Sequence, residues 1–313
     1  MSDEMLYVEK YRPRKIEDCI LPQSLKTVFK KFVDDGFVPN LLLSGGPGVG
    51  KTTVARAMLS ELGCDSVIFN GSLNVDKDTL RTDIQRYASS MSLTGGRKYV
   101  ILDEADYLSP NHVQPALRNF MEEFSGNCGF ILTCNFKNKL IAPLHSRCSV
   151  IDFTITGAER AELAKQFHAR VCWILDQENI SYDRKVVAEV IRKFFPDWRR
   201  VLNELQRYAA SGAIDVGILS AVVDMDISDL VKTLRAKDFP SMRKWVASNP
   251  SIDSTSLFRK LYDTLGDYIE ADTIPALVMV LADYQYKAAF VTDQEINTAA
   301  CMTQIMLDCQ FKK

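Results

Sequence analysis

A glycine-rich stretch near the start of the chain has the spacing of a phosphate-binding loop. Residues 45–52 fit the pattern G-x-x-x-x-G-K-S/T, between an apolar run and a helical pattern. The glycines let successive backbone N–H groups point at phosphate oxygens, and the next helix offers its positive end to the same anion. Lys51 can reach the β- and γ-phosphates of a nucleotide, and the Thr52 hydroxyl can bind Mg²⁺. A plain glycine-rich turn would not explain the Lys-Thr pair in this strand–loop–helix context.

A second candidate for chemistry is a pair of carboxylates at the end of an apolar run. Asp103 and Glu104 close the predicted strand at residues 99–104. In a parallel sheet the carboxyl ends of the strands meet at the ligand crevice. Asp103 can then hold Mg²⁺, and Glu104 can orient or deprotonate an attacking water. The alternative interpretation is that both are solvated acids at the end of a strand. The presence of a phosphate-binding loop in the same chain favours the catalytic interpretation.

Several other polar residues lie where strands end or helices begin. Asn135 ends an apolar run, and Arg147 lies in a connection between two predicted strands. Arg199 and Arg200 open a predicted helix, where cations oppose the helix dipole. That mild cost favours another role for one of them, although solvated arginines are the commoner case.

Strands and helices alternate up to residue 153, which would bring these residues together. We expect strands at residues 41–43, 67–70, 99–104, 129–135 and 150–153. We expect helices at residues 24–33, 54–59, 78–90 and 111–124. The alternation predicts a parallel α/β sheet.

After residue 156 the predicted strands stop and the pattern is helical. We expect helices at residues 159–177, 183–194 and 197–211. From about residue 227 the chain is again helical, with breaks near Pro240, Pro250 and Pro275. Long apolar spans near the end predict a helical bundle that buries surface against copies of itself.

The composition is that of a soluble globular protein and excludes several classes. The 313 residues carry a net charge of −2, so any DNA binding needs a local basic surface. No apolar run approaches the roughly 20 residues that span a bilayer, and the acidic start lacks a signal segment. The eight cysteines form no C-x-x-C pair, which argues against a zinc site. We therefore expect a cytoplasmic protein with no membrane contact.

Six motifs together resemble one family, the AAA+ ATPase subunits of sliding-clamp loaders. They are Glu9-Lys10-Tyr11-Arg12-Pro13, the phosphate-binding loop, Asp103-Glu104-Ala105-Asp106, Thr133-Cys134-Asn135, Ser146-Arg147-Cys148 and Pro196-Asp197-Trp198-Arg199. The loop and the Asp-Glu pair specify only a P-loop ATPase. The Ser-Arg-Cys motif and the Tyr-Arg-Pro start narrow the resemblance to clamp loaders. The resemblance spans essentially the whole chain. It is greatest with the large clamp-loader subunits of T-even-type phages, which are similar to replication factor C small subunits.

The resemblance implies a fold and a set of partners. It implies an α/β P-loop NTPase (AAA+) domain at residues 1–155, an all-α lid at 156–226 and an all-α oligomerising collar at 227–313. ATP and Mg²⁺ are the implied ligands. The implied partners are a sliding clamp, primer–template DNA held through its phosphates, and, indirectly, the replicative DNA polymerase. The implied assembly has five subunits, made of copies of this chain and one smaller protein.

The family's roles at the nucleotide transfer to matching positions. The segment around adenine and ribose matches Val8, Glu9, Lys10, Tyr11 and Ile20. The phosphate contacts match Gly48, Val49, Gly50, Lys51, Thr52 and Thr53, with Thr52 and Asp103 at the Mg²⁺. Glu104 matches the catalytic base, Asn135 matches sensor 1, and Arg199 matches sensor 2.

Other family roles act between molecules. Arg147 matches the arginine finger, which acts on ATP bound to the neighbouring subunit. Gln114, Arg118 and Glu122 match helix positions that couple neighbouring sites, and Arg118 can pair with Glu122 four residues on. Arg81 looks like the basic position that contacts DNA and restrains the catalytic glutamate, with Lys77 as its competitor. Tyr87, Met91 and Leu93 fall where the family docks its clamp, unless they are simply core.

Other functions remain open at this point. Another AAA+ motor directed to DNA would share the ATPase motifs, although residues after 227 show no basic recognition helix. The letters Asp-Glu-Ala-Asp also occur in RNA helicases, but residues 156–313 lack the strands of a second RecA-like lobe. A scaffold that binds ATP without hydrolysing it is a third alternative, against which Glu104, Asn135 and Arg147 all argue.

Overall fold

The computed structural model describes residues 6–73, 78, 80–92, 95–210, 212–215, 227–249 and 254–312. The chain divides into two compact units, Met1–Val222 and Val223–Lys313. The first unit contains a parallel sheet, followed in the sequence by a set of helices, and the second unit is helical.

The sheet has five parallel strands in the order β2-β3-β4-β1-β5. Their bounds are β1 Leu41–Ser44, β2 Ser66–Asn70, β3 Lys98–Asp103, β4 Cys128–Cys134 and β5 Ser149–Asp152. The three central strands, β3, β4 and β1, are almost fully buried, and their carboxyl ends lie side by side. This order brings the phosphate-binding loop, Asp103 and Asn135 to one edge, as the alternating pattern predicted.

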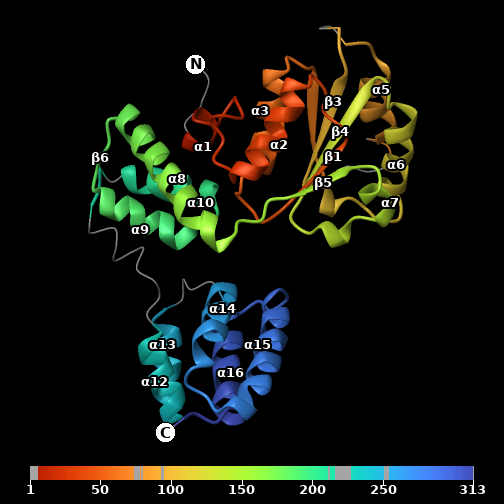
Figure 1. The fold of residues 1–313 in the computed structure, drawn as a ribbon. Helices are drawn as coiled ribbons and strands as arrows, with labels where there is room; N and C mark the ends of the chain where they lie inside the picture. The colour runs from red at the N-terminus through yellow and green to blue at the C-terminus, as the bar shows by residue number, and fades with distance from the viewer. Residues whose placement is uncertain are drawn as a thin grey trace. The chain divides into compact units, whose positions relative to one another are not determined.

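Helices cover both faces of the sheet (Figure 1). On one face lie α2 Gln23–Asp34 and α3 Lys51–Glu61, and on the other lie α5 Gln85–Ser89, α6 Val113–Glu123 and α7 Ala142–His145. Successive strand residues point to opposite faces. Leu41 and Leu43 therefore pack with Phe29 and Met58, whereas Leu42 packs in the other core. The helix expected at residues 78–90 is a π-helical turn at Leu80–Ile84 followed by α5.

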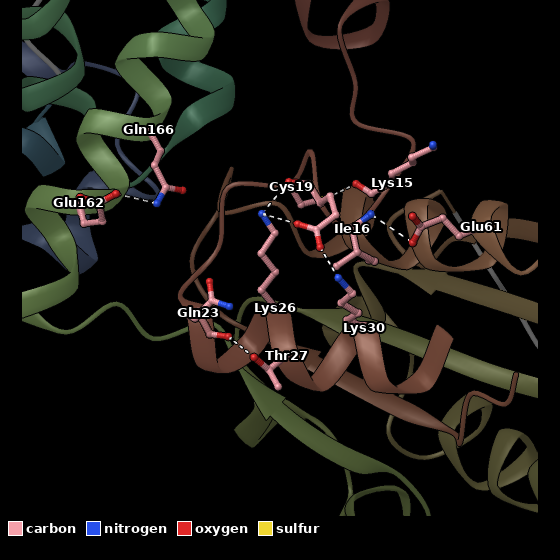
Figure 2. A network of polar contacts seen from close by, with 11 residues as sticks. Lys15, Ile16, Cys19, Gln23, Lys26, Thr27, Lys30, Glu61, Glu162 and Gln166 are labelled. Atoms are coloured by element: carbon pink, nitrogen blue, oxygen red, sulfur yellow. Dashed lines mark hydrogen bonds and ion pairs between the residues drawn. The ribbon is translucent and has the colours of Figure 1, made fainter. Parts of the chain in front are cut away.

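An arm precedes α2 and is held against α2 and α3 (Figure 2). It begins with the short helix α1 Tyr7–Lys10. Lys26 of α2 donates to the backbone carbonyl of Glu17 at 2.6 Å, and Lys30 pairs with its carboxylate at 2.5 Å. The Ile16 N–H bonds Glu61 of α3 at 3.3 Å. These contacts fix the course of the arm across α2 and α3.

Three helices follow the sheet within the first unit. They are α8 Gly157–Gln177, α9 Arg184–Phe194 and α10 Trp198–Ala209. Thr156 and Glu159 form a capping box at the start of α8, and Asp197 accepts from the Arg200 N–H at the start of α10. The expectation that strands stop at residue 156 is wrong in one detail, because β6 Ser181–Tyr182 pairs with β7 Ala213–Ile214. Two residues are too few to show a period along the sequence.

The second unit is a helical bundle around one apolar core. Its helices are α12 Ser228–Ala236, α13 Phe239–Ala247, α14 Ser254–Leu265, α15 Ile274–Ala288 and α16 Gln294–Asp308. Pro240 and Pro275 lie in the first turns of α13 and α15, where a missing N–H costs nothing, and Pro250 lies outside the described residues. Among the described helices, none has the length and apolar character to cross a bilayer.

Candidate active site

The phosphate-binding loop connects β1 to α3, and its lysine is held at its centre. The Lys51 ammonium donates to the carbonyls of Gly45 and Gly46 at 2.7 Å each and to the Asn135 Oδ1 at 2.9 Å. Lys51 is only 8% exposed, and this burial lowers the pKa of its ammonium. A buried cation needs an anion or several acceptors. The loop thus presents a positive charge beside the predicted sensor residue.

Gly48 and Gly50 have left-handed backbone conformations, with φ of +69° and +98°. Gly48 also lies against the start of α10. A Cβ at this position would meet the Asp197 Oδ1 at 1.7 Å, and the Trp198 N–H donates to the Gly48 carbonyl at 3.2 Å. Position 48, which the motif leaves open, therefore needs glycine in this chain both for the turn and for the approach of Asp197.

The predicted Mg²⁺ residues lie next to each other. The Thr52 hydroxyl donates to the Asp103 Oδ1 at 2.7 Å, and the Thr133 hydroxyl bonds the same oxygen. One hydroxyl and one carboxylate fit Mg²⁺, which takes few protein ligands and completes its shell with phosphate and water. In the described ranges, no cluster of three or more His, Cys, Asp or Glu forms a metal site by itself. The residues therefore suit Mg²⁺ that arrives with a nucleotide.

Glu104 has an unusual backbone at the end of β3. Its φ and ψ are 55° and 44°, in the left-handed region that non-glycine residues rarely adopt. Its N–H donates to the Thr133 Oγ1 at 3.2 Å, and Gly71 packs against its carbonyl oxygen. Such strain at a functional position persists only where neighbours hold it. Thr133, which the sequence marked only as part of a motif, supports both carboxylate residues.

The arm, the loop and the helices after the sheet enclose one pocket. Its walls include these residues predicted to bind the nucleotide: Val8, Tyr11, Ile20, Gly48, Val49, Gly50, Lys51, Thr52, Thr53 and Arg199. Contrary to the prediction, Glu9 and Lys10 do not line it; Glu9 pairs with Arg12, and Lys10 pairs with Glu178. Several further residues line its walls that were not predicted to do so: Arg12, Pro13, Asp18, Cys19, Leu21, Val54, Phe167, Arg170, Ile174, Trp198 and Leu202. The helical spacing of Phe167, Arg170 and Ile174 was the available signal for one wall.

The three predicted coupling residues have different surroundings. Gln114 is fully buried and bonds the backbone of Leu108, Lys139 and Ile141 at 2.8–3.2 Å. Glu122 bonds the guanidinium of Arg147. The expected pair between Arg118 and Glu122 is wrong, because Arg118 bonds Asn119 instead.

The predicted DNA and clamp residues are only partly described. Lys77 and Leu93 lie outside the described residues, and Arg81 is described only by its place in the π-helical turn. Met91 is 89% exposed. Tyr87 is half-buried beneath the Lys98 ammonium, and burial raises the pKa of its phenol to about 12. Tyr87 thus packs against the core, and Met91 is the exposed member of this group in the described part of the chain.

Replacing Lys51 with alanine should weaken ATP binding as well as turnover. The change removes the only cation of the loop and the donor to Asn135. We expect ATP affinity to fall by at least tenfold, measured by titration with a fluorescent ATP analogue. Lys165→Ala on α8, outside the pocket, is the control. Binding unchanged in the Lys51 variant would contradict the assignment of this loop.

The sequence and the fold both match known proteins. The profile of the ATPase family associated with various cellular activities (AAA) matches residues 41–154. The profile of the sliding-clamp-loader large subunit, AAA+ ATPase lid domain, matches residues 159–220. A solved RuvB structure from Thermotoga maritima has a TM-score of 0.50 at 20% identity, over 82% of this chain and 87% of its own. At that identity it supports the fold alone.

Relatives with known names cover nearly the whole chain. The sliding-clamp-loader large subunit of Escherichia phage RB69 is 38% identical and that of Enterobacteria phage T4 is 33% identical, each over 99% of this chain and 98% of the relative. The replication factor C small subunit of Sulfurisphaera tokodaii is 28% identical over 97% of this chain and 96% of its own. The chain therefore belongs to the family of sliding-clamp-loader large subunits, within the AAA ATPases.

Proposed function

We propose that this chain is the ATPase subunit of a DNA polymerase sliding-clamp loader. ATP binding would open the ring-shaped clamp for placement on primer–template DNA, and DNA-triggered hydrolysis would release the loaded clamp. The proposal is carried by a pocket lined by the phosphate-binding loop, whose Lys51 and Thr52 bond Asn135 and Asp103. It is supported by the match to clamp-loader large subunits over 99% of this chain. We propose domains at residues 1–155, 156–226 and 227–313 for ATPase, lid and collar.

The residues that line the pocket would divide the work of hydrolysis with Asp103, Glu104 and Asn135, which lie at the ends of the neighbouring strands and do not line it. Lys51 binds the phosphates, and Thr52 with Asp103 would hold Mg²⁺, which supplies positive charge to the phosphate oxygens when bound. Glu104 accepts a proton from the attacking water. Asn135 contacts Lys51 and orients the end of the phosphate chain, and Arg199 reaches the nucleotide from α10.

Arg147 acts on a neighbouring subunit in this proposal. It is not among the described residues that line the pocket of its own chain, and it lies between α7 and β5 with its side chain about one third exposed. Glu122 of α6 holds its guanidinium, and Gln114 of the same helix ties together the backbone around it. The coupling residues would therefore set the position of the finger.

The collar would join copies of this chain to one smaller subunit in a five-membered assembly. Its helix α15 carries an exposed apolar stripe at alternating spacings of four and three residues: Pro275, Met279, Ala282 and Tyr286, followed by Phe290. Exposed apolar surface of this kind marks protein interfaces, and this spacing suits the packing of helices from two subunits.

Substituting Tyr286 and Phe290 together with serine should abolish assembly and leave ATP binding unchanged. Both rings are about 70% exposed in the single chain, so the substitutions cost the isolated unit little. Light scattering after size-exclusion chromatography measures the assembly. Tyr262→Ser on α14 is the matched control, because it removes a half-exposed ring from another helix. An assembly that survives the double change would contradict the role of α15.

A loading assay tests the function itself. Labelled clamp, primed circular DNA and this chain with its smaller partner are mixed with or without ATP, and clamp that stays on the circle is measured by gel filtration. We expect ATP-dependent retention that falls steeply with salt and ignores DNA sequence, because the contacts are to phosphate. Turnover stimulated by DNA without any loading would favour another AAA+ motor. ATP binding with no turnover would favour a scaffold.

Work on DNA would place the protein in the cytoplasm, which is the host cytosol if the protein is phage-encoded. There it would serve the replicative polymerase indirectly.

A further inference from the structure

The arm at the start of the chain is attached to the helices after the sheet by one carboxylate. Glu178 lies directly after α8, where it is the C-cap. Its Oε1 accepts from the Lys10 ammonium at 2.7 Å and from the Tyr11 hydroxyl. These bonds lower the pKa of the Glu178 carboxyl, with the Lys10 bond as the largest cause. One oxygen thus holds two consecutive residues of the arm.

Further contacts join the same two segments. The Gln206 Oε1 of α10 accepts from the Tyr7 N–H at 2.9 Å, and Arg170 of α8 donates to the Tyr11 carbonyl at 3.3 Å. The Tyr11 ring packs edge-on against Trp173, with centroids 5.6 Å apart. The first part of the arm, from Tyr7 to Tyr11, is therefore seated on α8 and α10, and Glu178 supplies the carboxylate in this contact.

The two segments joined by this attachment both line the pocket. Val8 and Tyr11 form its arm side, and Phe167, Ile174 and Leu202 form the side that faces them from α8 and α10. A carboxylate that fixes Tyr11 to the end of α8 fixes one wall against the other. Loss of the carboxylate would let the arm wall shift, while the phosphate loop would keep its own contacts through β1 and α3.

We propose that Glu178 is a positioning residue for nucleotide binding, which sets the arm wall against α8 and so determines how tightly the part of the ligand beyond the phosphates is held. The proposal rests on the proposed function only in taking ATP as the ligand. Glu178 touches no ligand itself, since it lies outside the residues that line the pocket, and it acts through Lys10 and Tyr11.

The decisive experiment compares ATP with a ligand that has phosphates alone. Glu178→Ala and the unchanged chain are titrated with a fluorescent ATP analogue, and inorganic tripolyphosphate is titrated in competition. We expect the Kd for ATP to rise about tenfold in the variant, in line with loss of hydrogen bonds to a charged group, and the Kd for tripolyphosphate to stay within about twofold. An equal rise for both ligands, or no rise for ATP, would overturn the proposal.

Three further variants make the test specific. Glu162→Ala removes another carboxylate of α8, which accepts from Gln166 of its own helix at 2.9 Å (Figure 2), and this variant should bind ATP normally. Glu178→Gln keeps an acceptor oxygen and should recover most of the affinity. Tyr11→Phe removes one hydroxyl and keeps the ring. It should weaken ATP but not tripolyphosphate, and it should add little in combination with Glu178→Ala.

The measurement separates this proposal from the function on which it rests. It needs neither clamp nor DNA, so a failure of clamp loading leaves its result intact. A Glu178→Ala protein that does not fold would lose tripolyphosphate binding and its thermal transition as well. In that case the Tyr11→Phe variant decides between the outcomes. If this variant binds ATP as tightly as the unchanged chain does, the role of Glu178 is refuted.

Discussion

Replacing Arg147 with alanine is expected to leave ATP binding intact and to abolish turnover stimulated by DNA. A trans arginine supplies charge at the transition state that a single subunit lacks, and in other NTPases such a residue contributes roughly 10³–10⁵ in rate. Arg147 lies apart from the described lining of its own pocket, so binding of ATP in cis should not depend on it. Steady-state ATPase with DNA and clamp, beside nucleotide titration, measures both quantities.

The control for this prediction is Arg192→Ala. Arg192 is an exposed arginine of α9 that pairs with Glu189 on its own helix, and its loss should change neither quantity. Assemblies that mix Arg147→Ala subunits with unchanged subunits add a second check. In such an assembly a variant subunit should still bind ATP, and an unchanged neighbour can supply the arginine finger to it. Normal stimulated turnover in the pure Arg147 variant would remove it from the mechanism.

Replacing Glu104 with glutamine should separate binding from hydrolysis. Glutamine keeps the size of the side chain and cannot accept the proton of the attacking water, so turnover should fall by about 10²–10⁴. ATP should still bind, because Lys51 and Thr52 keep their contacts. We therefore expect a complex with clamp that forms on addition of ATP and does not dissociate. Single-turnover hydrolysis and co-elution with labelled clamp measure the two effects.

The matched control is Glu123→Gln, at an exposed carboxylate on the last residue of α6. It should hydrolyse ATP at the normal rate. If Glu104→Gln turns over as fast as this control, another residue must act as the base, and the strained backbone of Glu104 would need a different explanation.

The positions of the candidate site residues at the carboxyl edge of the sheet were predictable because their signals are local in sequence. A glycine pattern between a strand and a helix, or an acid at the end of an apolar run, can be recognised without knowing what lies nearby in space. The structure accordingly pairs Lys51 with Asn135 and Thr52 with Asp103. The parallel sheet followed from the same alternation of strands and helices.

Contacts between distant segments could not be predicted from spacing. Glu178 is 168 residues from Lys10 in the chain, and neither residue suggests the other. The i, i+4 rule favoured a pair between Arg118 and Glu122, but the connection before β5 brings Arg147 to Glu122 instead. Tyr87 shows the same limit, because an apolar residue near a helix end fits either a core or a docking surface until its neighbours are known.

The central claim is that hydrolysis depends on both DNA and a sliding clamp. The most direct measurement is the steady-state ATPase rate of the purified chain with its smaller partner, with no addition, with primer–template DNA, with clamp, and with both. We predict that both together stimulate far more than the sum of their separate effects. Stimulation by DNA that is indifferent to the clamp would contradict the account and indicate another DNA-directed motor, and no turnover under any condition would indicate a scaffold.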